Sequence, residues 1–131
     1  MIRGIHGFIF LILFSFSLSV LGQQQSIKVS LQDVLKNPDE YNGKLIETRG
    51  FLLQEYENSG LYVSDKWRHT EGIWITPGME MHRLRGEVNH HYMVLTGVFN
   101  ANDHGHLGVF KGTLTVNKFS FDQDARRPES K

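Results

Sequence analysis

Three side chains with metal-binding chemistry lie close together in the sequence: Asp103, His104 and His106. Imidazole nitrogens and carboxylate oxygens are ligands of divalent transition metals such as zinc and copper. In an extended segment, residues 104 and 106 point to the same side. The spacing gives one hypothesis, a metal site at His104 and His106 with a third ligand from elsewhere in the chain. The alternative is a loop of polar residues in which His106 caps or hydrogen-bonds to the backbone.

Aromatic residues form a second group, made up of Tyr56, Tyr62, Trp67 and Trp74. Exposed aromatic rings beside basic side chains are how proteins stack single-stranded nucleic acid. We expect Tyr62 and Trp74 to pack in the core instead, because each stands among apolar neighbours in a strand. The chain has 14 basic and 14 acidic residues, so it lacks the positive charge that attracts a phosphate backbone. Nucleic-acid binding is therefore a minor alternative.

Signatures of known catalytic centres are missing from the sequence. There is no cysteine, and therefore no thiol nucleophile. No serine stands in a G-x-S-x-G turn, and there is no H-E-x-x-H, phosphate-binding glycine loop or dinucleotide-binding motif. A hydrolase reading would need basic residues clustered around a carboxylate-bound cation, which the sequence does not display. We predict that the protein is not an enzyme and that it needs no cofactor.

The N-terminus has the three-part layout of a secretory signal peptide. Arg3 and His6 precede an apolar run over residues 8–21, and Val20 and Gly22 provide residues tolerated at a cleavage site. The apolar run is shorter than the ~20 residues that cross a bilayer, and no cysteine follows it for lipid attachment. We expect cleavage after Gly22, a periplasmic or secreted protein, and no stable membrane insertion; a retained anchor is the minority alternative.

The remaining chain has the length of one domain. Ser30 is placed to cap a helix of about two turns, which Asn37 and Pro38 end. The expected strands occupy residues 44–54, 61–64, 73–76, 92–100 and 107–121. Residues 77–89 are expected to form one helical turn and a loop, with Met79, Leu84 and Val88 facing inward.

Two of the long strands carry a glycine in their interior, Gly50 and Gly97. Interior glycines are typical of strands that bend or bulge so that a sheet can close. We predict a mainly β protein, a small five-stranded OB-type Greek-key β-barrel with a short N-terminal helix. Its divisions are a signal peptide (1–22), a lead-in segment (23–29), the OB-fold domain (30–121) and a flexible tail (122–131). An open β-sandwich is the alternative architecture.

Several short motifs support the barrel: NP at 37–38, YNGK at 41–44, GF at 50–51, GVFNA at 97–101, GHLG at 105–108 and GTL at 112–114. The pattern resembles an uncharacterised group of small exported bacterial OB-fold proteins over residues 30–119. The matching residues are mainly glycines, turn formers and core apolar residues. The resemblance therefore implies a fold and carries over no catalytic residue.

Ligands of OB barrels meet the face of the second and third strands and the loops that flank it. In this chain those loops are residues 55–60 and 101–105. The predicted ligand-binding residues are Tyr56, Tyr62, Trp67, Asn102 and Asp103. The predicted function is a non-enzymatic binding module of the bacterial envelope, whose partner is an envelope protein, a peptide or a glycan. The alternatives are the metal site, nucleic-acid binding, and a domain that only stabilises an assembly.

Overall fold

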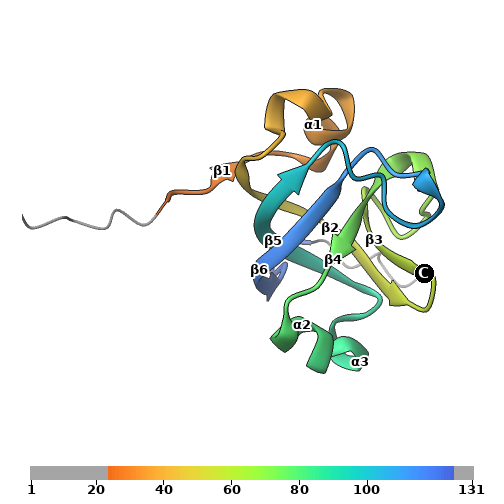
Figure 1. Cartoon of the computed structure of the whole chain (residues 1–131). Helices are drawn as coiled ribbons and strands as arrows, with labels where there is room; N and C mark the ends of the chain where they lie inside the picture. Colours follow the sequence, from red (N-terminus) through yellow and green to blue (C-terminus); the bar gives the residue numbers. More distant parts are fainter. Residues whose placement is uncertain (1–23, 126–131) are drawn as a thin grey trace, which may run out of the picture.

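A computed structural model of the protein describes residues 24–125, apart from the side chain of residue 69 (Figure 1). The predicted signal peptide and residues 126–131 of the predicted tail lie outside the described residues. Within them the protein is mainly β, as predicted. No described helix is long and apolar enough to cross a membrane.

Six strands and three short helices make up this part of the chain. In chain order they are β1 (Ile27–Lys28), α1 (Leu31–Lys36), β2 (Leu45–Glu55), β3 (Asn58–Tyr62), β4 (Gly72–Thr76), α2 (Met79–Arg83), α3 (Arg85–Val88), β5 (His91–Asn100) and β6 (Thr113–Phe121). Short 3-10 turns occupy Pro38–Tyr41, His69–Glu71 and His106–Gly108.

Local sequence signals set the bounds of α1. The Ser30 hydroxyl accepts a hydrogen bond from the Asp33 N–H at 3.1 Å, which satisfies one free donor of the first turn. The helix ends at Lys36, before Asn37 and Pro38, because the residue before proline is pushed out of the helical region. Both the cap and the stop are as predicted.

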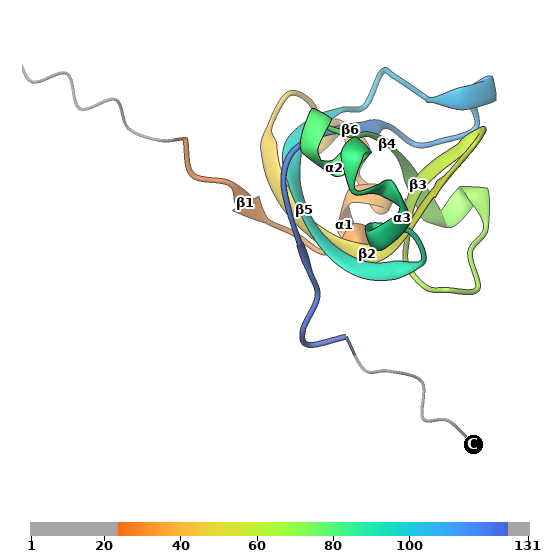
Figure 2. The ribbon, with the colours of Figure 1, turned by 90° about the horizontal axis from the view of Figure 1, so that it is seen from below.

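Five strands pair in a closed ring, in which the last strand pairs again with the first. β2 pairs with β3, β3 with β4, β4 with β6, β6 with β5, and β5 again with β2. All of these pairs are antiparallel except β4 and β6, which are parallel. A further strand, β1, pairs in parallel with the start of β2, which leaves a six-stranded sheet where the sequence predicted five strands. Seen from below, α2 and α3 lie across one end of the ring (Figure 2).

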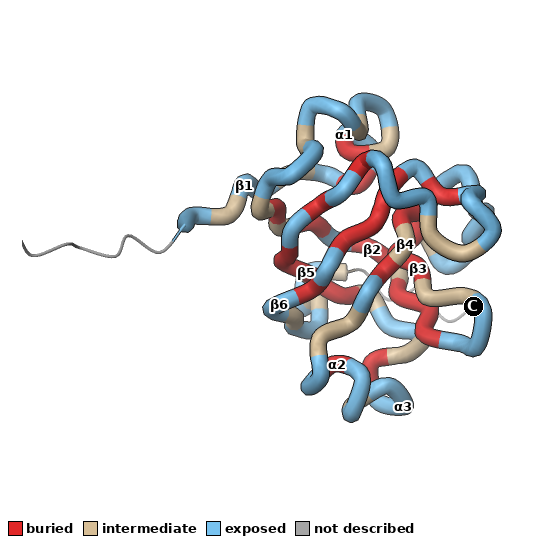
Figure 3. Tube along the Cα trace, in the orientation of Figure 1, coloured by how far each residue is buried: buried red, intermediate tan, exposed pale blue. Residues whose placement is uncertain are grey.

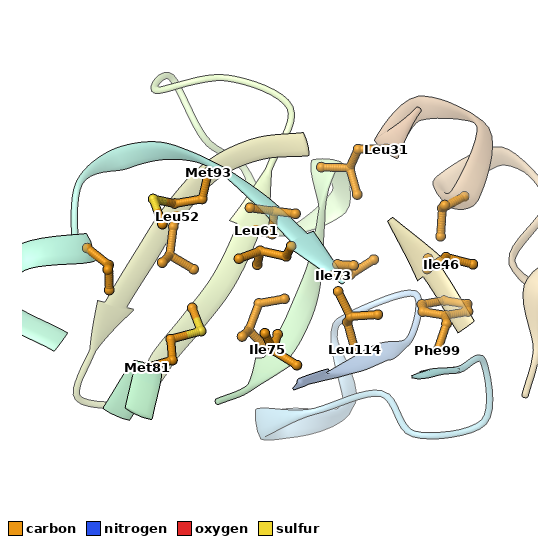
Figure 4. Packing of buried hydrophobic residues seen from close by; sticks show 14 of the residues in the cluster. Leu31, Ile46, Leu52, Leu61, Ile73, Ile75, Met81, Met93, Phe99 and Leu114 are labelled. Carbon is orange, nitrogen blue, oxygen red and sulfur yellow. The ribbon is translucent and has the colours of Figure 1, made fainter. Parts of the chain in front are cut away.

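Alternate residues of the strands fill the interior. Along β2, for example, Ile46, Thr48, Leu52 and Gln54 are buried, while Arg49 is exposed. Figure 3 shows this alternation as buried segments along the strands, and Figure 4 shows the apolar side chains packed between them. The helices close the ends of this core: Leu31 of α1 at one end, and Met81 of α2 and Val88 of α3 at the other.

Both predicted interior glycines lie where another backbone approaches closely. A Cβ atom at Gly50 would lie 2.5 Å from the Tyr62 carbonyl oxygen, and one at Gly97 only 2.0 Å from the Thr115 carbonyl oxygen. Gly97 also adjoins the irregularity at which the register of β5 and β6 shifts. The glycines thus permit strand approaches that a side chain would prevent.

Three local predictions are wrong. The strand predicted from Leu107 begins only at Thr113, because Leu107 and Gly108 have φ values of 58° and 67°, outside the extended region. Residues 77–89 form two helices, and Met79 is 87% exposed because Met81 takes the inward position. The hairpin between β2 and β3 turns within two residues, so β3 begins earlier than predicted.

Candidate ligand-binding site

The predicted binding face is an aromatic patch on the outside of β2, β3 and β4. Its buried members are Leu53, Tyr62 and Phe110, with Phe51 and Trp74 packed against them. We call this set the outer cluster. The side chains of its strand residues point away from the main core because they alternate with the inward residues of the same strands, while Phe110 is contributed by the loop before β6. The residues that the sequence assigned to ligand contact lie in this cluster or around it.

Tyr62 is fully buried in the outer cluster. Its ring lies over Gly60 and Gly72, where a Cβ atom would lie 2.6 Å and 2.5 Å from ring carbons. The Trp67 ring covers it at a centroid distance of 5.3 Å, and the hydroxyl donates a hydrogen bond to Asn58 Oδ1 at 2.6 Å. Tyr62 therefore packs within the protein and presents no surface on which a ligand could stack.

Burial of Tyr62 makes the stability of the protein sensitive to high pH. Burial raises the pKa of the Tyr62 hydroxyl to about 12. The unfolded chain gives up this proton near pH 10, before the folded protein does. We therefore expect the free energy of unfolding to fall between pH 10 and 12, by at most about 1.4 kcal/mol per pH unit.

Urea unfolding at successive pH values measures this loss, with Tyr62→Phe as the control. The Tyr62→Phe protein should lose less stability than the native protein over the same interval. Equal losses in the two proteins would show that Tyr62 ionisation does not contribute.

The chain covers the outer cluster with its own loop, residues 101–112. Phe110 is 3% exposed and meets the Trp74 ring edge-on at 5.3 Å. Gly105 has a φ of 65°, and a Cβ atom there would lie 2.6 Å from Trp74 Cβ. His106 stacks on the Trp74 ring, with centroids 6.1 Å apart. This loop therefore occupies the face on which a ligand was predicted to bind.

Polar residues of the loop hold its own turns. Asn100 Oδ1 accepts from the Asn102 N–H at 2.9 Å, and Asp103 Oδ1 accepts from the Gly105 N–H at 3.1 Å. His104 Nδ1 lies 2.8 Å from the Phe110 carbonyl oxygen, with which it hydrogen-bonds. The side chains of Asp103 and His104 thus bond to the loop backbone, while Asn102 takes part through its backbone N–H. The alternative to a metal site expected such a backbone bond at His106, whose ring lies against Trp74 instead.

The metal hypothesis gains no third ligand from the structure. Among the described residues, no three His, Cys, Asp or Glu side chains come close enough to hold a metal ion. His104 is bonded to the backbone, while His106 lies against Trp74. The loop brings both histidines to the outer cluster and assembles no metal centre there from the described side chains.

Two predicted aromatic residues keep exposed surface. Tyr56 lies at the turn of the β2–β3 hairpin and is 89% exposed. Trp67, which covers Tyr62, is 39% exposed.

A pocket of about 230 Å³ lies beside Trp74 and is left open by the loop. Its lining residues come from the β2–β3 hairpin, from the end of β4 and the segment that follows it, and from α2 and α3. Helices α2 and α3 lie at the lower end of the molecule in Figure 1. We call it the Trp74 pocket. Its principal side chains are Gln54, Glu55, Ser59, Trp74, His82 and Arg85.

A short hydrogen-bond chain fixes the polar floor of the Trp74 pocket. The Ser59 hydroxyl donates to the Ile75 carbonyl at 2.7 Å, so its oxygen is left to accept from Gln54 Nε2 at 3.2 Å. The amide of Gln54 is thereby oriented, and its backbone N–H donates to Asn89 Oδ1 at 2.8 Å. The floor groups are uncharged, and the described residues leave Gln54 Oε1 buried without a hydrogen-bond partner.

Charges of opposite sign stand at the rim. Glu55 Oε1 is 2.6 Å from His90 Nε2, and its other carboxylate oxygen bonds to no described residue. Arg85 makes no ion pair with any described residue. The rim therefore offers a carboxylate acceptor on the hairpin and a guanidinium donor on α3.

Sequence reasoning missed the Trp74 pocket. It placed Trp74 in the core, although Ile73 and Ile75 on either side are the inward residues of β4. Strict alternation along a strand was the signal that puts Trp74 on the outer face. Arg85 and His82 carried no comparable signal, because the positions of α2 and α3 depend on tertiary packing.

Neither comparison with known sequences identifies a relative: no family model matches the chain, and no curated protein is significantly similar to it.

Proposed function

We propose that the protein is an exported, non-enzymatic binding module of the bacterial envelope, built on an OB-type β-barrel, whose ligand enters the Trp74 pocket. Five strands paired in the ring order β2, β3, β4, β6, β5 support this fold, because an OB barrel is a five-stranded Greek-key closure. Helices α2 and α3 connect β4 to β5 and cover one end of the ring (Figure 2).

Export to the periplasm or the medium rests on residues 1–22. An envelope protein, a peptide or a glycan is then the partner class within reach. Equal numbers of acidic and basic residues disfavour nucleic acid. The non-enzymatic part of the proposal rests on the absence of catalytic motifs from the sequence.

One observation carries the location of the binding site. The loop 101–112 covers the outer cluster, yet the adjoining Trp74 pocket stays open, with an aromatic wall, a fixed polar floor and free polar groups at its rim. Concave sites with apolar walls and a few placed polar groups are where small ligands bind.

The test starts with protein secreted by its own leader in a Gram-negative host. N-terminal sequencing of the periplasmic fraction should find Gln23 as the first residue. A chain that starts at Met1 and stays in the cytoplasm would overturn the export part of the proposal.

The purified protein, labelled with ¹⁵N, is then titrated with a library of small polar fragments. We expect shifts at the Trp74 indole N–H and at the backbone N–H groups of the lining residues Gln54, Glu55, Ser59, His82 and Arg85. Tyr56→Ala removes an exposed aromatic ring outside the pocket and should leave these shifts unchanged. Shifts confined to Tyr56 and Trp67, or none with any fragment, would contradict a binding site in the pocket.

A further inference from the structure

We infer that the Trp74 pocket binds a sugar, one neutral pyranose ring at the end of a glycan chain. The inference rests on the proposed function, since it names the ligand class for the same pocket. The size of the pocket, the charges at its rim and the polar groups of its floor each restrict the chemical class of the ligand.

Size limits the ligand to about one ring. The cavity of about 230 Å³ is smaller than the roughly 300–1,000 Å³ of pockets that take drug-sized molecules. One six-membered ring with its substituents is the scale that fits.

Rim charge argues against simple ions. Glu55 repels an anion, and Arg85 repels a cation, because both border the same small space. A hydroxyl group accepts from a guanidinium and donates to a carboxylate, so neighbouring hydroxyls on one ring satisfy both side chains. Glu55 keeps one carboxylate oxygen free for this, and Arg85 keeps its whole guanidinium.

Floor and wall distinguish a sugar from a zwitterion such as a free amino acid or a peptide terminus. The floor groups are the neutral Gln54 amide and Ser59 hydroxyl, which form no counter-charge for an ammonium or carboxylate lying deep in the pocket. The wall offers the apolar surface of Trp74 and Pro77. A pyranose has an apolar C–H face, which can pack against the wall. Its hydroxyl groups lie at the ring edges, where they can hydrogen-bond to the rim.

The experiment titrates the ¹⁵N-labelled mature protein with glucose, galactose, mannose and N-acetylglucosamine, and with the β-linked disaccharides of each. Alanine, the dipeptide Ala-Ala and inorganic phosphate are the zwitterionic and anionic probes. We expect at least one sugar to bind with a Kd on the order of 1 mM, with shifts at the Trp74 indole N–H. The charged probes should bind more weakly.

Two neighbouring arginines provide a matched pair of variants. Arg85→Gln removes the free guanidinium at the pocket and should raise the Kd about tenfold, as expected for loss of a hydrogen bond to a charged group. Arg83→Gln removes the same charge two residues away, where Arg83 is paired with Glu80 and does not line the pocket. Arg83→Gln should leave the Kd unchanged. Trp74→Leu should also weaken sugar binding about tenfold or more.

The possible results separate the sugar assignment from the proposed binding module. Fragment binding without sugar binding overturns the sugar assignment and leaves the binding module standing. Tighter binding of alanine or Ala-Ala than of any sugar overturns the assignment in favour of a peptide terminus. Sugar binding that Arg85→Gln leaves unchanged also overturns it, and this variant alters an exposed side chain, so folding is not at issue. Binding of no fragment and no sugar overturns both proposals.

Discussion

Alanine at Gly97 is expected to lower the free energy of unfolding by about 3 kcal/mol or more, or to prevent folding altogether. A Cβ atom there would lie 2.0 Å from the carbonyl oxygen of Thr115, and 3.0 Å from the Cα of Val116. Both are backbone atoms, so no side chain can rotate away to make room. Relief requires β5 and β6 to separate, and this pair is part of the ring of strands.

Gly86 is the matched control, because a Cβ atom there would meet nothing within 4 Å. Gly86 lies inside α3, where alanine is favoured over glycine by up to about 1 kcal/mol. Urea unfolding followed by circular dichroism should therefore find Gly86→Ala at least as stable as the native protein. Equal stabilities for the two alanine variants would contradict the close approach of β5 and β6.

Phe99→Ala is expected to lower the free energy of unfolding by about 3–5 kcal/mol. The side chain is fully buried in the main core, with Ile46 and Leu114 in the same cluster. Its ring also fills the space at Gly112, where a Cβ atom would lie 2.3 Å from the ring's Cζ. Phe99 thus joins the core to the start of β6.

A double-mutant cycle tests this arrangement. Gly112→Ala should be destabilising alone, because the new methyl group meets the Phe99 ring. In the Phe99→Ala background the same methyl group enters the vacated space, so its cost should be lower by about 1 kcal/mol or more. Phe121→Ala, at an aromatic side chain 45% exposed, is the control and should cost much less than Phe99→Ala. Additive effects of Phe99→Ala and Gly112→Ala would contradict the packing.

Elements with local signals were predictable from the sequence. Ser30 and Pro38 mark the two ends of α1, because a cap and a proline act on the backbone next to them. The apolar stretches of β2 and β5 are long enough to identify both strands, and their interior glycines lie at close backbone approaches. The mainly β class of the protein follows from these elements.

Elements that depend on distant partners were not predictable. Two residues are too few to identify β1, which exists because β2 has a free edge beside Ile46. The alternation around Leu107 and Val109 is compatible with a strand, yet the loop backbone turns there while Gly105 and His106 lie against Trp74. The energy of that contact is not represented in the local pattern.

The candidate site likewise has features that the sequence predicts and features that depend on the folded chain. Composition and local pattern identify which residues carry aromatic and polar chemistry, and they assign these residues to the strands and loops around one face. Tertiary structure decided that Tyr62 is buried, that loop 101–112 covers that face, and that Trp74 borders a pocket with Glu55 and Arg85. The reason is the sequence separation of the interacting residues. Caps, turns and strand alternation involve residues a few positions apart, whereas a pocket is formed by elements that only the folded chain brings together.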